Sequence, residues 1–287
     1  MAKGRELVGR IKSTENTRKI TRTMEMVSAS KMKRAMDRVI AARPYATALG
    51  DVISSLYNPE LAESFPLLRQ PQQVKRAAVI LLTSNRGLAG AFSANLIKEA
   101  RALIARLEGE GTEIELHAVG KKGIGYFKYV GRPLASQRID ISDRPTAADA
   151  ASLVDDLMQQ FIAGTLDAVY IVQSVYKSAL SAPPHSTQVL PVARPESAGT
   201  QKDYLLYPSA AAILTELLPA YVRNAVYRAL VETVAAEHSA RRTAMKNATD
   251  NATDMLTLYR RDYNRARQAN ITQEIAEIVG GASALQG

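Results

Sequence analysis

Residues 227–259, YRALVETVAAEHSARRTAMKNATDNATDMLTLY, contain neither glycine nor proline and decide the fold. Along this stretch a stripe of residues recurs at alternating steps of four and three, the spacing of a coiled-coil seam. Its members are mostly small or polar rather than leucine, so we expect a thin coil in which the helices approach closely. The stripe consists of Tyr227, Val231, Val234, His238, Arg241, Met245, Ala248, Ala252, Met255 and Tyr259.

The helix that carries this stripe is predicted to be long. From Ser209 to Val279 there is no glycine, and Pro219 is the single proline. Ser209 is a suitable N-cap, and the pair Gly280-Gly281 is a suitable stop. About 70 helical residues would span about 105 Å if unbroken. The alternative is that Pro219 separates the first turns from the rest.

A second long helix is predicted at the N-terminal end. Between Ile11 and Arg43 there is neither glycine nor proline, and we expect Pro44 to kink the helix or end it at Arg43. Apolar or small residues recur there at helical spacing. They are Ile20, Met24, Val27, Met32, Ala35, Met36 and Val39.

The middle of the chain alternates strand and helix patterns, which is typical of a mainly parallel sheet with crossover helices. Strands are predicted at 74–83, 113–119 and 167–176, with an edge strand at 186–192, and helices at 93–107, 123–130 and 146–162. Prolines and glycine mark the connections on both sides. The predicted segments are the N-terminal helix 1–57, a linker 58–73, the α/β domain 74–195, a linker 196–208 and the C-terminal helix 209–287.

The two long helices each need a partner for their stripes. An antiparallel two-helix coiled coil of the N- and C-terminal segments, with an inserted α/β domain, meets this need because the middle returns the chain. The alternative is two separate rods. The predicted fold class is therefore α/β plus long helices.

Charge and composition narrow the functional classes. The chain has 287 residues and a net charge of +9; residues 1–43 hold 12 Lys/Arg and 4 Asp/Glu, so nearly all the excess is there. Such asymmetry indicates an acidic partner or a solvated basic helix face. Without cysteine, disulfides and cysteine catalysis are excluded, and no apolar run approaches the ~20 residues of a membrane span.

Catalytic chemistry finds little support. Ser84–Ala91 follows a strand and precedes a helix, where a phosphate could bind, but its glycines Gly87 and Gly90 fit neither a P-loop nor a dinucleotide fingerprint. A tight turn is the simpler interpretation, for this stretch and for Gly120–Gly125. No nucleophile has a base at motif spacing, so we predict no catalytic, cofactor-binding or metal-binding residues. A nucleotide-binding α/β enzyme that uses Gly87–Gly90 remains the alternative.

Nucleic-acid binding is a third hypothesis, because Lys31, Lys33 and Arg34 lie within one turn of the N-terminal helix. With the basic residues upstream they wrap broadly around the helix instead of forming one line. Aromatic residues, which stack on single-stranded bases, are absent before Tyr45. A strong dependence of DNA affinity on salt would support this hypothesis.

Both ends of the chain resemble a known family. Asn16–Met32, NTRKITRTMEMVSASKM, resembles the first helix of the gamma subunit of F-type ATP synthase. Ala244–Ala252, AMKNATDNA, and Tyr263–Ile275, YNRARQANITQEI, resemble its last helix, and Thr83–Gly90 also fits. The resemblance spans essentially the whole chain, and without cysteine the redox insertion of some plastid relatives is excluded.

The resemblance implies a non-catalytic central rotor that turns inside a hexamer of alpha and beta subunits and couples proton flow through the membrane c-ring to ATP synthesis or hydrolysis. It also implies contact with an epsilon subunit, no nucleic acid, no direct membrane insertion, and a peripheral location on the cytoplasmic face of the bacterial plasma membrane. Bacterial origin is expected because the motifs follow closely behind Met1. The expected partner-contact residues are Met24, Lys31, Lys33, Arg34, Arg241, Arg267, Gln268, Thr272 and Glu274.

Overall fold

A computed structural model describes residues 2–56, 65–176, 178, 181–193 and 209–286. The chain forms two compact units. The coil unit consists of Met1–Ser28 and Arg242–Gly287, and the α/β unit consists of Ala29–Arg241. The helices α1 (Ala2–Leu56) and α6 (Ala210–Gln286) each contribute one part to both units.

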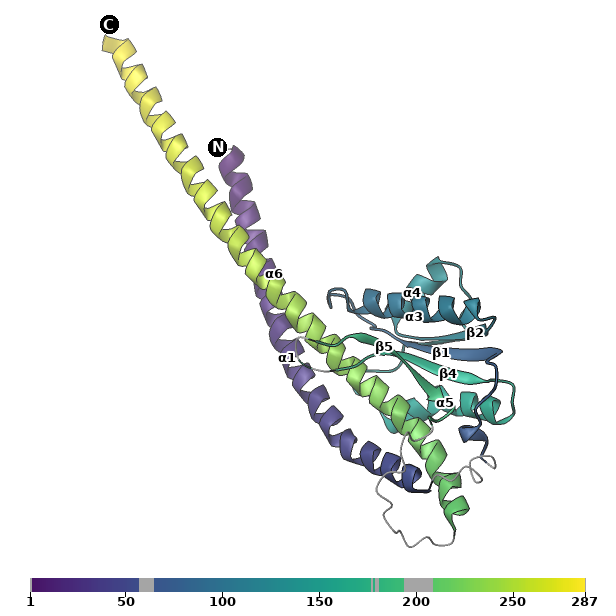
Figure 1. The fold of residues 1–287 in the computed structure, drawn as a ribbon. Helices are drawn as coiled ribbons and strands as arrows, with labels where there is room; N and C mark the ends of the chain where they lie inside the picture. Colours follow the sequence, from purple (N-terminus) through teal and green to yellow (C-terminus); the bar gives the residue numbers. More distant parts are fainter. Residues whose placement is uncertain (1, 57–64, 177, 179–180, 194–208, 287) are drawn as a thin grey trace. The chain divides into compact units, whose positions relative to one another are not determined.

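The α/β unit contains a five-stranded sheet (Figure 1). The strand order is β3-β2-β1-β4-β5, and every pairing is parallel except that of β4 with β5. The mainly parallel sheet predicted from the sequence is therefore confirmed. The remaining elements of this unit are η1 (Pro66–Leu68), β1 (Arg76–Leu82), α3 (Phe92–Gly109), β2 (Glu113–Val119), α4 (Lys121–Tyr129), β3 (Ser136–Arg138), α5 (Ala147–Ile162), β4 (Ala168–Ser174) and β5 (Pro184–Leu190).

Helices cover both faces of this sheet, because side chains alternate between faces along each strand. From β1, Val79 and Leu81 pack with α3 and with Phe127 of α4. The neighbouring Ile80 and Leu82 face the opposite core, which is formed with α5 and the first turns of α6. Residues 77–82 of the central strand are buried for this reason, and they form the continuous apolar run AAVILL in the sequence.

The two long helices also pack together inside the α/β unit. Ala35 and Val39 of α1 form a small core with Val231 and Ala235 of α6. Later residues of α1, such as Ile53, share the larger core with earlier residues of α6, such as Leu214. The direction of pairing is therefore antiparallel, as the sequence predicted.

Within the coil unit, α1 and α6 are also paired antiparallel (Figure 1). Thr249 Oγ1 lies 2.8 Å from Thr21 Oγ1, and Arg260 Nη2 lies 3.6 Å from Glu15 Oε2. The inward stripes have heptad spacing but are largely polar. They comprise Leu7, Ile11, Thr14, Arg18, Thr21, Glu25 and Ser28 on α1, and Met245, Thr249, Ala252, Leu256, Tyr259, Tyr263, Ala266 and Asn270 on α6.

The predicted stripes are partly wrong in the coil unit. Ile20 and Val27 are 60% and 50% exposed, and the inward positions beside them are Thr21 and Ser28. On α6 the stripe steps from Met245 to Thr249, so Met255 is exposed and Leu256 is buried in its place. Alanines near these positions are small enough to face inward whether the stripe steps by three residues or by four. The position of the partner helix decides which of the two spacings is used.

The helix ends also differ from the sequence predictions. The helix α1 continues through Pro44 to Leu56, and α6 contains Pro219. Buried residues beyond Pro44, among them Leu49 and Ile53, hold the following turns in place. The predicted stop at Gly280-Gly281 is wrong, because α6 extends to Gln286; glycine weakens a helix by about 1 kcal/mol but does not by itself end it.

Two other predictions about chain connections have different outcomes. The N-cap at Ser209 is confirmed, since the N–H of Ala212 donates to Ser209 Oγ at 3.2 Å. The predicted linker 196–208 lies outside the described residues, as does the first part of the linker 58–73. The described part of that linker includes the short helix η1, which the sequence analysis did not predict.

Candidate functional site

One turn of α6 in the α/β unit carries three charged or titratable side chains that are largely removed from water. Arg241 is 6% exposed, and its Nη2 donates to Glu237 Oε1 at 2.5 Å. The same guanidinium lies 3.2 Å from Nδ1 of His238 and donates from Nε to the carbonyl of Gly87 at 3.3 Å. Arg241 therefore joins α6 to the loop that follows β1.

A second charged pair meets the same turn of α6. Lys31 Nζ of α1 donates to Asp143 Oδ2 at 2.5 Å, and Nη1 of Arg38 donates to the Asp143 carbonyl at 3.2 Å. His238 Nε2 lies 3.7 Å from the same Asp143 Oδ2. We call Lys31, Asp143, Glu237, His238 and Arg241 the polar cluster.

Burial sets the protonation states in the polar cluster. It lowers the pKa of His238 to about 4, although the nearby Asp143 opposes this, so the imidazole is neutral near pH 7. Burial also raises the pKa of Glu237 against the effect of Arg241. For Asp143, burial alone would raise the pKa, but the hydrogen bond from Lys31 and the nearby positive charges, among them Arg86, together outweigh it, and the pKa is lowered.

The glycine-containing stretch Ser84–Ala91 forms the connection between β1 and α3. Leu88 and Gly90 both have positive φ, and the carbonyl of Gly87 accepts from Arg241. Ser84 Oγ lies 2.8 Å from Ser93 Oγ, which closes the turn onto the start of α3. These contacts favour the interpretation of this stretch as a tight turn that binds α6.

The second glycine-containing turn allows β1 and β2 to end side by side. Gly120 has φ of +95°, and a Cβ there would lie 2.1 Å from the carbonyl oxygen of Thr83. Thr83 Oγ1 donates to the Val119 carbonyl at 2.8 Å and accepts from the N–H of Gly123 at 2.9 Å. A glycine is required at position 120 by both the conformation and the close approach.

The structure places the predicted partner-contact residues of the α/β unit in two environments. Lys31 and Arg241 come together in the polar cluster, where intrachain partners already occupy their charges. Lys33 and Arg34 are exposed on α1, and within the described residues the Arg34 side chain hydrogen-bonds only to Ser30, one turn earlier. Lys33 and Arg34 are therefore the two basic residues of this group that are open to another molecule.

The other predicted contact residues lie in the coil unit. Met24 is half-buried on α1, whereas Arg267, Gln268, Thr272 and Glu274 are exposed on α6. Thr272 Oγ1 donates to the Gln268 carbonyl at 2.9 Å, a bond within the helix. The four residues on α6 are therefore accessible to another molecule.

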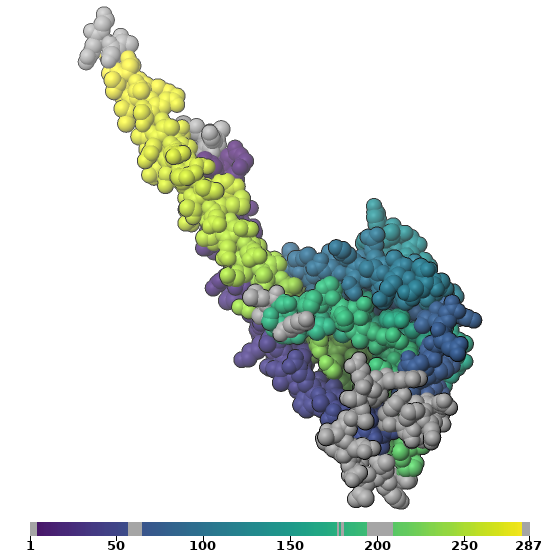
Figure 2. Space-filling model, viewed as in Figure 1, coloured from purple at the N-terminus to yellow at the C-terminus, as the bar shows by residue number. Residues whose placement is uncertain are grey.

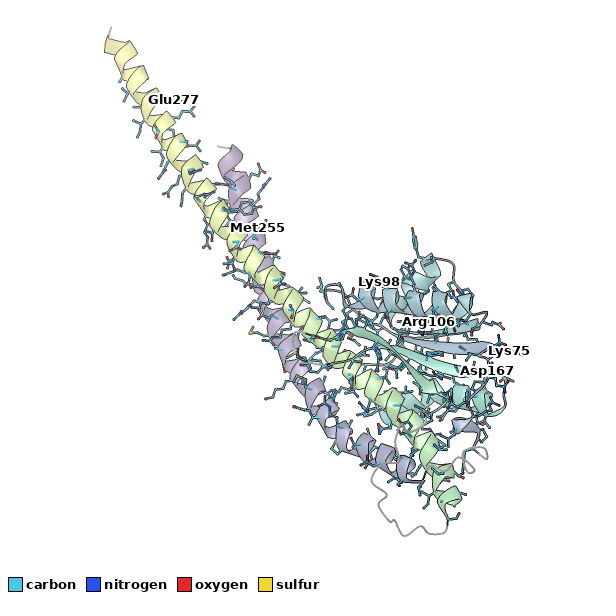
Figure 3. The ribbon with its side chains drawn as sticks, viewed as in Figure 1. Lys75, Lys98, Arg106, Asp167, Met255 and Glu277 are labelled. Carbon is cyan, nitrogen blue, oxygen red and sulfur yellow. The ribbon has the colours of Figure 1, made fainter. Side chains whose placement is uncertain are left out.

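The end of α6 continues past the start of α1 (Figure 2). All side chains from 271 to 282, which we call the helix tip, are exposed. Ile278 is 72% exposed, and Ile271, Ile275 and Val279 are about half exposed. Glu277, labelled in Figure 3, is bonded to Gln273 within the helix. From Ile275 to Leu285 the sequence has one charged residue, Glu277, and the side chain of Leu285 lies outside the described residues.

Sequence reasoning missed part of the polar cluster. His238 and Arg241 were placed in the coil stripe, but Asp143 and Glu237 were not recognised as candidates. The spacing of Glu237 and Arg241, four residues apart on a helix, was the available signal for that pair. The contact of Lys31 with Asp143 joins residues 112 positions apart, and no local pattern indicates it.

The described residues include no group of three or more His, Asp or Glu side chains placed to hold a metal ion. Among the same residues, no helix combines the length and the apolar character that crossing a bilayer requires.

Known proteins resemble this chain over its whole length. A family model described as ATP synthase matches residues 3–285. The ATP synthase gamma chain of Gemmatimonas aurantiaca is 68% identical and covers 100% of both chains. The corresponding gamma chain of Leptospira biflexa is 43% identical over 99% of this chain and 100% of its own length.

Solved structures share the fold. A chain of the Euglena gracilis mitochondrial ATP synthase, in a structure described as OSCP/F1/c-ring, superposes with a TM-score of 0.67 at 19% identity, over 99% of this chain and 95% of that one. A chain of the Tetrahymena thermophila central stalk/c-ring structure gives a TM-score of 0.62 at 24% identity, over 80% of this chain and 99% of that one. From the family match and the full-length identities, the chain belongs to the ATP synthase gamma chain family.

Proposed function

We propose that this chain is the central rotor shaft of an F-type ATP synthase and has no active site of its own. It turns inside the hexamer of alpha and beta subunits and couples proton flow through the membrane c-ring to ATP synthesis or hydrolysis on beta. Family membership supports this role, and structures of similar fold are described as the central stalk and the rotor.

The helix tip is the observation that carries the proposal. Four aliphatic side chains there are about half exposed or more, on a helix end that extends past its partner. Exposed apolar surface of this kind marks a contact with another molecule. An apolar collar formed by the surrounding subunits would cover the tip, and few directional bonds would resist its rotation.

The basic residues on α1 supply a second contact. Lys33 and Arg34 are exposed, and in the proposed complex they face acidic loops of the beta subunits. A rotating shaft changes the affinity of each beta site only if its contacts differ among orientations. Exposed charges meet this requirement, because their attraction acts over several ångströms without interlocking the surfaces.

The remaining parts of the proposal come from the family. Met24 and the exposed residues Arg267, Gln268, Thr272 and Glu274 would contact beta. The α/β unit would lie near the epsilon subunit and the c-ring, on the cytoplasmic face of a bacterial membrane, with no nucleic acid bound. The segments 1–57, 58–73, 74–195, 196–208 and 209–287 remain the predicted division into domains and linkers.

The test combines assembly with proton pumping. The full chain is expressed with its alpha, beta and epsilon subunits and the membrane sector, and ATP-driven acidification of membrane vesicles is measured. We expect the Ile275→Asp, Ile278→Asp double variant to fold normally but to lose most of the pumping, because charge is placed in an apolar contact. Full pumping by this variant would contradict the proposed role of the tip.

A matched control separates the tip from surface charge in general. Val130, in the α/β unit, is 56% exposed, as is Ile275. Val130→Asp adds the same kind of charge to an exposed aliphatic residue, and it should leave pumping unchanged. An equal loss of pumping in the control and in the tip variant would mean that the helix tip has no specific role in coupling.

The basic contact is tested by charge removal. Lys33→Ala with Arg34→Ala should lower the number of protons pumped per ATP hydrolysed and leave the fold intact. Lys31→Ala should instead weaken the fold, because it leaves Asp143 without its bonded cation. Unchanged coupling in the Lys33, Arg34 double variant would exclude the electrostatic contact.

A further inference from the structure

A cavity of about 500 Å³ lies in the α/β unit, where β1 and β2 end. Its walls come from the loop after β1, the start of α4, residues 139–144 and one face of α6. In open α/β sheets, ligands commonly bind outside the carboxyl ends of the strands. The volume is within the range of sites for small organic molecules, about 300–1,000 Å³.

The cationic side chains of this cavity have no hydrogen-bonded partner among the described residues, whereas its acidic groups are already bonded to cations. Arg86, Lys121 and Arg144 line it, and in the part of the chain that the structure describes their side chains make no hydrogen bond or salt bridge. Each of the three acidic lining residues forms a salt bridge with a basic residue that does not line the cavity. Asp140 pairs with Arg138, Asp143 with Lys31, and Glu237 with Arg241. The cavity therefore presents three cations without a hydrogen-bonded partner, of which Arg86 also interacts electrostatically with the nearby Asp143.

The rest of the wall is part polar, with Thr83, Ser142 and Thr233, and part apolar. Leu82 and Val119 at the strand ends, with Ile141 and Leu230, are buried lining residues. Inorganic phosphate would leave this apolar surface uncovered. An organic group attached to the phosphate would cover it and exclude water, which strengthens the contacts with the cations.

Intrachain bonds hold the loops of the cavity in place. Asn85 Nδ2 donates to the carbonyls of Ile139 and Ile141, at 3.1 and 3.3 Å. Asn85 Oδ1 accepts from the N–H of Lys121 at 3.1 Å. One side chain thus joins the loops that follow β1, β2 and β3, so a ligand would find the cations already positioned.

We propose that this cavity binds a small organic phosphate of nucleotide size, with Arg86, Lys121 and Arg144 on the phosphate groups and the apolar wall on the organic part. The site is separate from the helix tip and from the exposed Lys33 and Arg34. It would give the chain a regulatory ligand of its own, and it does not depend on the rotor role.

Calorimetric titration of the full chain with ADP tests the proposal, with adenosine and inorganic phosphate as separate probes. We expect one ADP per chain and weaker binding of both fragments. Arg86→Ala with Arg144→Ala should weaken ADP binding at least about tenfold, because charge-assisted hydrogen bonds are lost. Lys121→Gln should also weaken it, and this variant keeps the backbone N–H that bonds Asn85.

Lys98→Ala is the matched control, because Lys98 lies on α3 (Figure 3), away from the cavity lining. Circular dichroism checks that every variant is folded. No ADP binding at millimolar concentration would overturn the proposal, as would equal weakening by Lys98→Ala. Inorganic phosphate bound as tightly as ADP would exclude the organic part. An oligoglutamate peptide that binds where ADP does not would assign the cations to an acidic partner protein instead.

Discussion

Leu81 in the α/β unit and Leu256 in the coil unit are both nearly inaccessible to water, but they are buried in different ways. Leu81 lies on the central strand beneath α3, inside a core of many apolar side chains. Leu256 lies in a seam whose neighbouring stripe positions include Ala252 and Tyr259. The α/β unit thus buries its apolar side chains in a core of its own, whereas much of the helix surface in the coil unit stays exposed and available for contact with other molecules.

The largest expected difference comes from equal truncations of the two leucines. Leu81→Ala should lower the free energy of unfolding by about 4–5 kcal/mol, because a tightly packed core cannot close around the cavity. Leu256→Ala should cost about 2–3 kcal/mol, because two helices can approach each other more freely. Urea denaturation of the full chain, followed by circular dichroism, measures both. Equal losses would show that the seam is packed as rigidly as the core.

The polar cluster makes the stability of the α/β unit depend on pH. The pKa of His238 is about 4 in the folded chain against 6.5 ordinarily, so the unfolded chain binds more protons between these values. Stability should therefore fall as pH drops from 6.5 to 4, by about 3 kcal/mol in total.

The comparison of wild type with His238→Gln isolates this effect. Burial lowers the pKa of His117 as well, so both proteins keep that contribution. Denaturant unfolding at a series of pH values should show a shallower slope for the variant over this interval. The same slope in both proteins would contradict a neutral buried His238.

Overpacking tests how closely the coil helices approach. Ala252 is 5% exposed in the seam, whereas Ala248 is half-buried at its side. Ala252→Leu should cost about 1–3 kcal/mol, and Ala248→Leu should cost less. Thermal unfolding of the two variants measures this order. A larger loss of stability for Ala248→Leu would show that Ala248 faces the partner helix, as the stripe predicted from sequence periodicity requires.

The smallest expected effect concerns the threonine pair of the seam. Thr249→Val should cost about 1 kcal/mol, because it removes the hydrogen bond between the helices, although Thr21 Oγ1 keeps its bond to the Arg18 carbonyl. The double variant with Thr21→Val should cost little more than the single variant, since the bond between the helices is already lost. A double-mutant cycle by denaturation measures the coupling. Strictly additive losses would mean that the bond contributes nothing.

The same contrast explains what the sequence could predict. The strand 113–119 was predicted with the bounds that β2 has, because alternation and apolar runs report burial in a sheet. In the coil the rule that apolar residues face inward failed at Ile20, Val27 and Met255. The inward positions there include Thr21, Ser28 and Thr249, and the apolar residues beside them face outward.

The resemblance indicated candidate contact residues only within continuous motifs. Arg267, Gln268, Thr272 and Glu274 follow one another in or near such a motif and are exposed along α6, and their contact with a partner stays a prediction. The polar cluster and the cavity bring together α1, three loops and α6. Contacts at such separations depend on the folded sheet, and one sequence has no local pattern that reports them.

The bond between Thr21 and Thr249 has a mechanical consequence. Apolar seams of uniform leucine tolerate sliding by a heptad, because each position meets an equivalent one. A polar pair favours one alignment, since a shift would break the bond between the helices and leave each hydroxyl only the carbonyl of its own helix, Arg18 or Met245. The bond thus favours one register of the two helices, which opposes slippage when one of them is twisted.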